Sequence, residues 1–420
     1  MLFVLSALSA VAVPAGAADA DLVNFEHVFN YPFSATGTDL EFYTATVPLR
    51  DYATGGYVDE QGNPLADGAA PIMAARDFAV VGAEDKGAFV FDITDPAHPA
   101  FVRLIACAQS QNDVQIKQFG DRWILALARD GSTIPCVRTK TFGTGGAGIA
   151  VFDITDPYLA KGLWSFRVTG GAHNFTFHPT KPYGWVSTAE LPGAASSSAH
   201  IPIIDFTDLS NPVLAGDVST TEGSPHDISF SADGSRAYVA AENNLQIWDS
   251  TDPVHPARIS VTVGPATYVH GLDPTPNRKL MVMTDEDLAL GGFFAPAAVC
   301  PGGGLTFYDI DGSLESAPVP VGFFEAEVRG PSTTAPCTAH VGRIAANNHV
   351  MTTAWYGGGV RVVDFSNPST PTEIGHAVMP GTDAWSAKFF KGPYVYVGDL
   401  SRGFDVFKWT GAGTPPWEAA

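Results

Sequence analysis

Residues 88–96 read AFVFDITDP, and residues 149–157 read IAVFDITDP. In both stretches an apolar run that favours a β-strand ends at an aspartate, and a polar turn closed by proline follows. Weaker copies of the phrase end their apolar run at four further aspartates, Asp205, Asp249, Asp309 and Asp364. The spacing of these aspartates varies from 44 to 61 residues, which indicates a repeated unit with loops of different length. We expect each aspartate to accept backbone N–H groups of its turn, which is a structural role.

Each repeat unit contains the patterns of four strands. In the most compact copy, residues 227–230 and 237–240 are two apolar runs joined through Asp233-Gly234, and Asp-Gly between such runs is a strong hairpin signal. The run that ends at Asp249 is the third strand, and residues 213–218 are typical of the outer, fourth strand. Four-stranded units that recur at roughly this length are typical of β-propeller blades.

The sequence therefore predicts an all-β fold, with a single β-propeller over residues 18–410. We expect seven blades, because seven inner strands begin near Asp39, Asn112, His173, His226, His270, His340 and Asp383. Six or eight blades are the alternatives, since the long insertion at residues 47–75 can be interpreted in more than one way. The last unit shows only three strands, so we expect residues 22–28 to supply its outer strand and close the ring. Residues 411–420 are expected to form a flexible tail.

The repeat resembles the LVIVD repeat of secreted bacterial and archaeal β-propeller proteins. The signature of that family is an apolar strand and an aspartate, followed by Ser/Thr-Asp-Pro, and the copies most similar to it are residues 90–96 and 362–368. The resemblance covers nearly all of the chain after residue 17. It implies the propeller fold but no particular activity. The copy at Asp309 departs most from the signature because it lacks the proline.

The N-terminus and the cysteines favour a secreted protein, extracellular or periplasmic. Residues 1–17 combine an apolar run with small residues at its end, as in a signal peptide, although the usual basic residue before the run is absent. In an oxidising compartment, two local disulfides are the simplest pairing, Cys107 with Cys136 and Cys300 with Cys337. No other stretch approaches the roughly 18 apolar residues of a membrane span, and we expect a monomer.

The charge of the chain bears on its partners. It carries 44 acidic and 23 basic residues, for a formal net charge of −21. Such a surface repels phosphate backbones and anionic lipid, which both bind through Lys and Arg. We therefore expect no nucleic-acid partner, and an extracellular protein, peptide, glycan or small molecule is the expected ligand.

Four of the eleven histidines occupy the same place in their repeats, at the start of an inner strand: His173, His226, His270 and His340. Inner strands line the channel of a propeller, so these imidazoles are expected at one mouth of it. The antiparallel second strands end at the same face, where the candidate carboxylates are Glu190, Glu242, Asp285 and Glu286. Imidazole and carboxylate groups are ligands, or orient ligands, for a divalent transition metal such as Zn, Cu or Fe. In the alternative interpretation the histidines only hydrogen-bond carbonyl groups of neighbouring blades.

These observations lead to two hypotheses about function. The first is an extracellular binding or interaction scaffold, with a histidine-rich metal or ligand site at the mouth of the channel. The second is a metal-dependent extracellular enzyme, an oxidase or a hydrolase, that uses the same histidines. The sequence assigns no catalytic residue.

Overall fold

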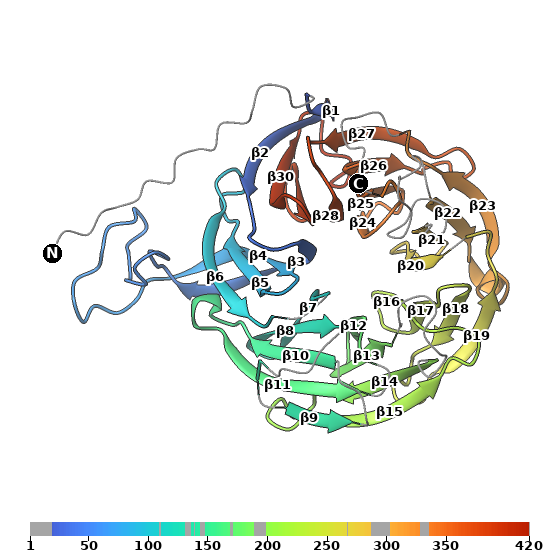
Figure 1. Cartoon of the computed structure of the whole chain (residues 1–420), viewed down its shortest axis with the longest axis horizontal. Coiled ribbons are helices and arrows are strands. Elements are labelled where there is room, and N and C mark those ends of the chain that lie inside the picture. The colour runs from blue at the N-terminus through green and yellow to red at the C-terminus, as the bar shows by residue number, and fades with distance from the viewer. Residues whose placement is uncertain are drawn as a thin grey trace.

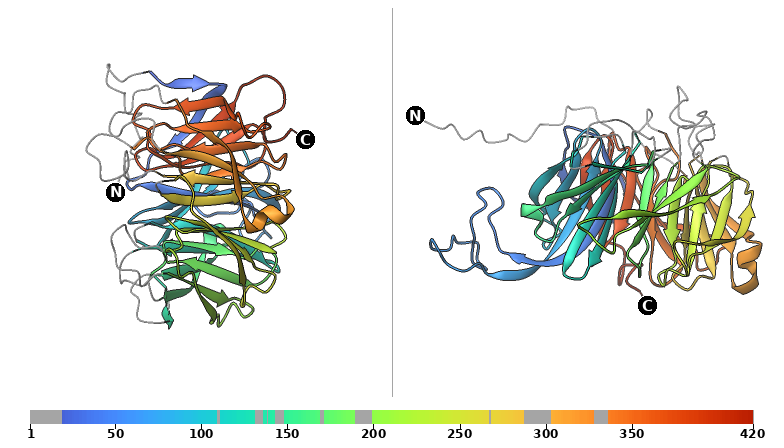
Figure 2. Two further views of the ribbon diagram at one scale, coloured as in Figure 1. Left: turned by 90° about the vertical axis from the view of Figure 1, so that its right-hand side faces the viewer. Right: turned by 90° about the horizontal axis from the view of Figure 1, so that it is seen from below.

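The computed structural model describes residues 19–108, 111–130, 136–137, 139–142, 148–168, 171–188, 199–266, 268–286, 303–327 and 336–419. The strands of these residues form seven sheets around a central channel (Figure 1). The prediction of a seven-bladed, all-β propeller is confirmed. The only helices among the described residues are two short 3₁₀ helices. The insertion at residues 47–75 adds no blade, because it extends the first hairpin away from the ring (Figures 1 and 2).

The first four blades follow one another along the chain. Their strands, from the inner to the outer edge, are β3 (Gly37–Pro48), β4 (Met73–Ala83), β5 (Gly87–Asp92) and β6 (Ala100–Ala106) in blade 1; β7 (Asp113–Phe119), β8 (Arg122–Arg129), β10 (Gly148–Asp153), β11 (Lys161–Val168) and β9 (Thr139–Phe142) in blade 2; β12 (Asn174–Phe177), β13 (Tyr183–Ser187), β14 (His200–Asp205) and β15 (Val213–Ser219) in blade 3; and β16 (Asp227–Phe230), β17 (Arg236–Ala240), β18 (Leu245–Asp249) and β19 (Ala257–Thr262) in blade 4. The fifth strand of blade 2, β9, pairs parallel with β11, and the repeat does not predict it.

The last three blades complete the circle. Their strands, in the same order, are β20 (Val269–Pro274), β21 (Leu280–Asp285), β22 (Gly304–Asp309) and β23 (Val319–Phe324) in blade 5; β24 (Gly342–Ile344), β25 (Val350–Ala354), β26 (Val360–Asp364), β27 (Thr372–Val378) and β1 (Asp21–Val23) in blade 6; and β28 (Ala384–Phe389), β29 (Tyr394–Asp399), β30 (Gly403–Trp409) and β2 (Phe25–Tyr31) in blade 7.

The N-terminal strand closes the last blade, as predicted. Strand β2 pairs antiparallel with β30, so the two ends of the propeller share one sheet and β2 covers the edge that β30 would otherwise leave open. The expected bounds were partly wrong, because the first part of this segment, β1, pairs with β27 of blade 6. Asn24 separates the two strands with a φ of 60° and donates its side-chain amide to the carbonyl of Ile374 at 2.7 Å.

The repeated aspartates build the turns between the third and fourth strands. In all six copies Oδ1 of the aspartate accepts the backbone N–H group two residues later, at 2.7–3.0 Å. Asp309 makes this bond although its copy lacks the proline. The prediction of a structural role is confirmed.

The hydrophobic core lies between the blades. Each of seven clusters of buried side chains joins two adjacent sheets, and the cluster between blades 7 and 1 contains Phe404 and Phe91, whose ring centroids are 4.6 Å apart. Packing of this kind fixes the rotation of every blade relative to its neighbour. It therefore also fixes the direction in which the inner strands point.

The predicted disulfide between Cys107 and Cys136 is present and links the chain after β6 to the chain before β9. Cys337 is disulfide-bonded as well, while its expected partner Cys300 and the predicted signal peptide, residues 1–17, lie outside the described residues. In the predicted tail, Trp417 is buried and stacks on Phe389 with 5.7 Å between ring centroids. No helix in the described part of the chain is long and apolar enough to cross a membrane.

Candidate metal centre

The four aligned histidines lie side by side at one mouth of the channel. His173 and His226 directly precede β12 and β16, His270 is the second residue of β20, and His340 lies two residues before β24. Their ring centroids are separated by 4.2 Å (His173–His226), 4.4 Å (His226–His270) and 4.1 Å (His270–His340). We call this row the histidine arc. Equivalent positions of adjacent blades face the same axis, and this brings together residues that are up to 167 positions apart in the sequence.

Backbone hydrogen bonds hold three of these histidines in equivalent places. The N–H groups of His173, His226 and His340 each donate to a carbonyl of the second strand of their own blade, at 2.7–2.9 Å. His270 differs, because the register of β20 against β21 shifts between Val269 and Gly271. This bulge carries the ring of His270 into the arc.

Hydrogen bonds of the rings determine which nitrogen is available as a ligand. Nδ1 of His226 contacts the carbonyl oxygen of His270 at 3.1 Å, and Nδ1 of His340 contacts the carbonyl oxygen of Trp385 at 2.6 Å. A carbonyl oxygen can only accept, so Nδ1 must carry the proton in both rings. Nε2 of each ring therefore keeps its lone pair. The two interpretations of the sequence are compatible, because one ring nitrogen bonds a carbonyl of the next blade while the other keeps a lone pair that can bind a ligand.

A group of three residues could hold a metal ion. One ligand atom each from His226, His270 and Glu286 lies within 4.8 Å of the other two. All three side chains are buried, with exposed fractions of 4, 4 and 5%. Nε2 of His340 lies 3.8 Å from Oε1 of Glu286, so a fourth ring borders the group.

The protonation states favour metal binding over proton binding at the histidines. Burial holds the pKa of His226 and His270 well below the usual range and lowers the pKa of His340 to about 3, and neighbouring imidazoles add to the effect. These rings are therefore neutral at pH 7. Burial also raises the pKa of Glu286 to about 7, against the opposing effects of a hydrogen bond from Tyr356 and the charge of His173.

His173 has a different environment from the other three. Burial disfavours its imidazolium, but Asp130, whose Oδ1 lies 2.8 Å from Nδ1, outweighs this and raises the pKa of His173. Nε2 of the ring faces the side-chain amide of Gln111 at 3.4 Å. The arc thus ends in a His–Asp pair.

The structure separates the four candidate carboxylates. Glu286 lies in the cluster, and Asp285 is turned to accept the backbone N–H of Tyr268 at 3.0 Å. Glu242 has a φ of 57°, and its carbonyl accepts the N–H of Val269. Glu190 lies outside the described residues.

From the sequence, the Trp355-Tyr356 pair either lines a ligand pocket or plugs the channel mouth, and the structure brings Tyr356 into contact with the cluster. Its hydroxyl donates to Oε1 of Glu286 at 2.7 Å, and its ring packs against His340 with 4.7 Å between centroids. The available signal is its position, because the Trp355-Tyr356 pair stands where other repeats have a carboxylate at the end of the second strand.

Two further histidines, His98 and His255, belong to the turns between the third and fourth strands of their blades. His98 and His255 each pair through Nδ1 with the aspartate three residues earlier, in equivalent turns of blades 1 and 4, at 2.9 and 3.1 Å. Both side chains are about four-fifths exposed. They lie in the outer turns and not at the channel.

Comparisons with known proteins support the repeat and the fold. The model of the LVIVD repeat matches residues 69–105 and 354–377, which include the turns at Asp92 and Asp364. Among solved structures, the β-propeller domain of Cps50 (Swd1) from Myceliophteria thermophila superposes with a TM-score of 0.54 at 10% identity, over 80% of this chain and 94% of that one. At this identity the likeness concerns the fold alone. No curated protein matches the sequence. The chain is a seven-bladed β-propeller with LVIVD repeats.

Proposed function

We propose that this propeller is a secreted binding scaffold. Its ligand would bind at a divalent transition metal that His226, His270 and Glu286 hold at the mouth of the channel. The observation that supports it is the convergence of three buried ligand atoms within 4.8 Å of one another. Donor atoms around a tetrahedral metal lie about 3.3 Å apart, so a side-chain movement of about 1 Å would close the site.

The donor set restricts the class of metal. Two imidazoles and one carboxylate suit Zn, Cu or Fe(II) and leave coordination positions open. The hydroxyl of Tyr356 donates to Glu286 and would hold its carboxylate in place. A partner with a basic nitrogen or a carboxylate, on a protein, peptide, glycan or small molecule, could then bind the metal directly.

Secretion fits the same proposal. The disulfide between Cys107 and Cys136 suits an oxidising compartment, and the apolar N-terminus resembles a signal peptide. The acidic surface suits a soluble monomer outside the cell.

One observation favours the second hypothesis, a metal-dependent hydrolase. His173 and Asp130 form a partly buried pair directly beside His226, and Asp130 raises the pKa of His173. A metal lowers the pKa of a bound water to about 7, and a His–Asp pair next to it could accept the proton. Hydrolysis of ester or phosphoester probes by the metal-loaded protein, lost in His173→Ala, would favour this function over binding alone.

Elemental analysis tests the metal site itself. The purified chain is reconstituted in turn with Zn²⁺, Cu²⁺ and Fe²⁺ and desalted, alongside a variant with His226→Ala and His270→Ala. The matched control carries His98→Ala and His255→Ala, which removes two histidines from the outer turns. We expect one metal per chain in the wild type and the control and none in the first variant. A metal-free wild type, or equal metal in all three proteins, would sink the proposal.

A further inference from the structure

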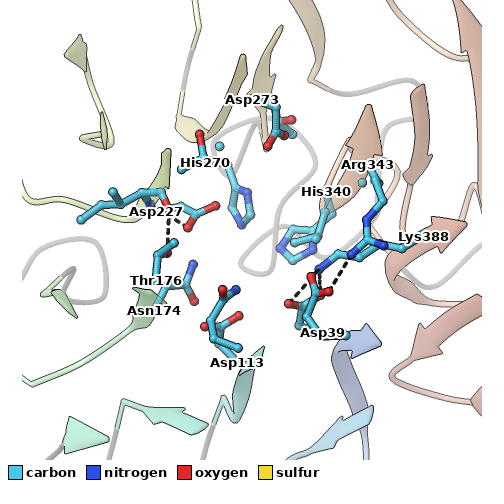
Figure 3. A pocket seen from close by; sticks show the side chains of 18 of the residues that line it. Asp39, Asp113, Asn174, Thr176, Asp227, His270, Asp273, His340, Arg343 and Lys388 are labelled. Atoms are coloured by element: carbon cyan, nitrogen blue, oxygen red, sulfur yellow. Dashed lines mark hydrogen bonds and ion pairs between the residues drawn. The ribbon is translucent and has the colours of Figure 1, made fainter. Parts of the chain in front are cut away.

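A cavity of about 320 Å³ lies in the channel beside the histidine arc. His270 and His340 line one end of it, and its lining continues along the inner strands to Pro276, an exposed residue beyond the end of β20 (Figure 3). The cavity therefore follows the axis of the ring from the arc towards the far ends of the inner strands.

One wall of this cavity is electrically balanced. Nζ of Lys388 lies 2.8 Å from Asp39 and 2.9 Å from Glu41, and Arg343 pairs with Glu41 at 2.6 Å. Two cations thus face two carboxylates, as the dashed lines in Figure 3 indicate for Asp39. This cluster needs no further charge.

Three further aspartates around the cavity form no ion pair in the described part of the chain. Asp113, Asp227 and Asp273 come from β7, β16 and β20 and point into the cavity (Figure 3). Asp113 accepts the N–H of Phe175 at 3.2 Å, and Asp227 accepts the N–H of Ile228 at 2.7 Å. Within the described part of the chain, none of the three forms an ion pair, and Asp273 accepts no hydrogen bond. Burial raises the pKa of Asp113 and brings that of Asp273 to about 7, against the opposing charge of Lys388.

The ring of His270, which the proposed metal site also uses, provides a further observation. Its ring lines the cavity and is 4% exposed, yet neither ring nitrogen makes a hydrogen bond to another described residue. A buried polar group without a partner costs free energy, and it is usually satisfied by water or a ligand. This ring and the three aspartates face the same space.

The arrangement of the aspartates indicates the kind of ligand. Carboxylates that line a channel and form no ion pair favour a cation. Among the described residues, Asp113, Asp227 and Asp273 do not belong to any group of three acidic or histidine ligands within 4.8 Å of one another, as a bare metal ion would need. Separated acceptors instead fit a ligand with several separated N–H donors. The cavity also has the size of a small-molecule pocket.

We propose that this cavity binds an aliphatic di- or triamine, with its ammonium groups against Asp113, Asp227 and Asp273. The site uses different carboxylates from the metal cluster and does not depend on a bound metal. It adds a small-molecule ligand to the binding scaffold proposed above.

Calorimetry with 1,4-diaminobutane and with spermidine tests this site at pH 8, using the full chain. We expect one amine per chain, and a double variant with Asp227→Asn and Asp273→Asn should bind at least about tenfold more weakly, because each charged hydrogen bond contributes about 1.5–3 kcal/mol. The control carries Glu60→Gln and Asp121→Asn, which remove two exposed charges, and should bind like the wild type.

Zinc binding by the double variant serves as the check that its channel is still folded. Retained zinc with weakened amine binding supports the amine site, and it separates this proposal from the metal proposal. A wild type that binds no amine at millimolar concentration overturns the inference. So does unchanged amine affinity in the double variant, or Ca²⁺ binding at these aspartates in place of amine.

Discussion

At the scale of single residues, the histidine arc combines a structural role with a free donor atom. In His226 and His340 the Nδ1 hydrogen bond to a carbonyl fixes the ring and its tautomer, and the same bond leaves the lone pair of Nε2 available, which in His226 is the proposed ligand atom. Burial keeps both rings neutral by lowering their pKa. The hydrogen bonds that join neighbouring blades therefore also orient these histidine rings for metal binding.

Tyr356→Phe tests how Glu286 is held. The substitution removes the hydroxyl that lies 2.7 Å from Oε1 and leaves the ring in place. Since this hydrogen bond counteracts the raised pKa of Glu286, its loss should leave the carboxylate protonated at pH 7. We expect zinc affinity to fall by about 10- to 100-fold, measured by competition with a chromogenic chelator. Tyr308→Phe is the control, because that buried tyrosine lies in the core away from the arc, and equal losses in both variants would refute the role of Tyr356.

The sequence was sufficient to place the histidines but not to complete the site. Their shared offset in the repeat predicts that they meet, since the propeller maps equal positions onto one axis. The contact between Tyr356 and Glu286 joins blades 6 and 5 across 70 residues. It depends on the bridge between Tyr356 and Ala384 of blade 7, and no local pattern specifies such a contact. The three channel aspartates were missed for the same reason.

At the scale of secondary-structure elements, the six aspartate turns share one hydrogen bond but differ in their surroundings. Asp249 lies near the surface and bonds within its turn, with Arg236 at 3.5 Å. Asp92 is buried, and its Oδ2 also accepts from the hydroxyl of Tyr52 at 2.7 Å and from Nε of Arg76 at 2.8 Å. The long first hairpin supplies both of these partners, so the insertion at residues 47–75 stabilises the turn of blade 1.

This difference predicts that replacing Asp249 and replacing Asp92 lower the free energy of unfolding by different amounts. Asp249→Ala should reduce the free energy of unfolding by about 1 kcal/mol, the net value of a hydrogen bond. Asp92→Ala leaves Arg76 and Tyr52 without their buried partner and should cost about 2–4 kcal/mol. Urea unfolding followed by tryptophan fluorescence measures both values. An Asp249→Ala variant as unstable as Asp92→Ala would show that the surroundings of the turn do not matter.

The pairing of strands could be predicted only where the repeat governs it. The hairpins within each unit follow from turn residues such as Asp233-Gly234. The partners of β1 and β9 do not, because both are added to the outer edge of a blade after the repeat pattern is complete. Such partners are determined by tertiary packing, which a local sequence pattern does not specify.

At the scale of the whole molecule, the ring encloses more buried acid than base. Carboxyl groups at the channel, among them Asp273 and Asp383, have a pKa raised to about 7, with burial as the largest cause. The folded chain holds these protons up to about pH 7, whereas the unfolded chain releases them near pH 4. Each such group therefore lowers the free energy of unfolding as the pH rises from about 4 to 7.

The buried histidines, whose pKa is lowered, have the opposite effect on the pH dependence of stability. A single substitution separates the contribution of Asp273 from theirs. Asparagine stays uncharged, so Asp273→Asn should gain stability relative to the wild type between pH 5 and pH 8, by a few degrees in Tm. Asp249→Asn is the comparison, because the hydrogen bonds of its turn lower the pKa of Asp249, and its difference from the wild type should stay constant over this range. Thermal unfolding by circular dichroism gives both differences, and a constant difference for Asp273→Asn would mean that the channel does not raise its pKa.

The central claim is that the seven-bladed ring assembles a metal site from His226, His270 and Glu286. X-ray diffraction at the zinc absorption edge, on crystals of the zinc-loaded chain, measures this directly. We predict one anomalous peak at the mouth of the channel, at about 2.0–2.2 Å from one nitrogen of each histidine and one oxygen of Glu286. An ordered channel with no peak between these three side chains, or zinc bound only elsewhere, would contradict the claim.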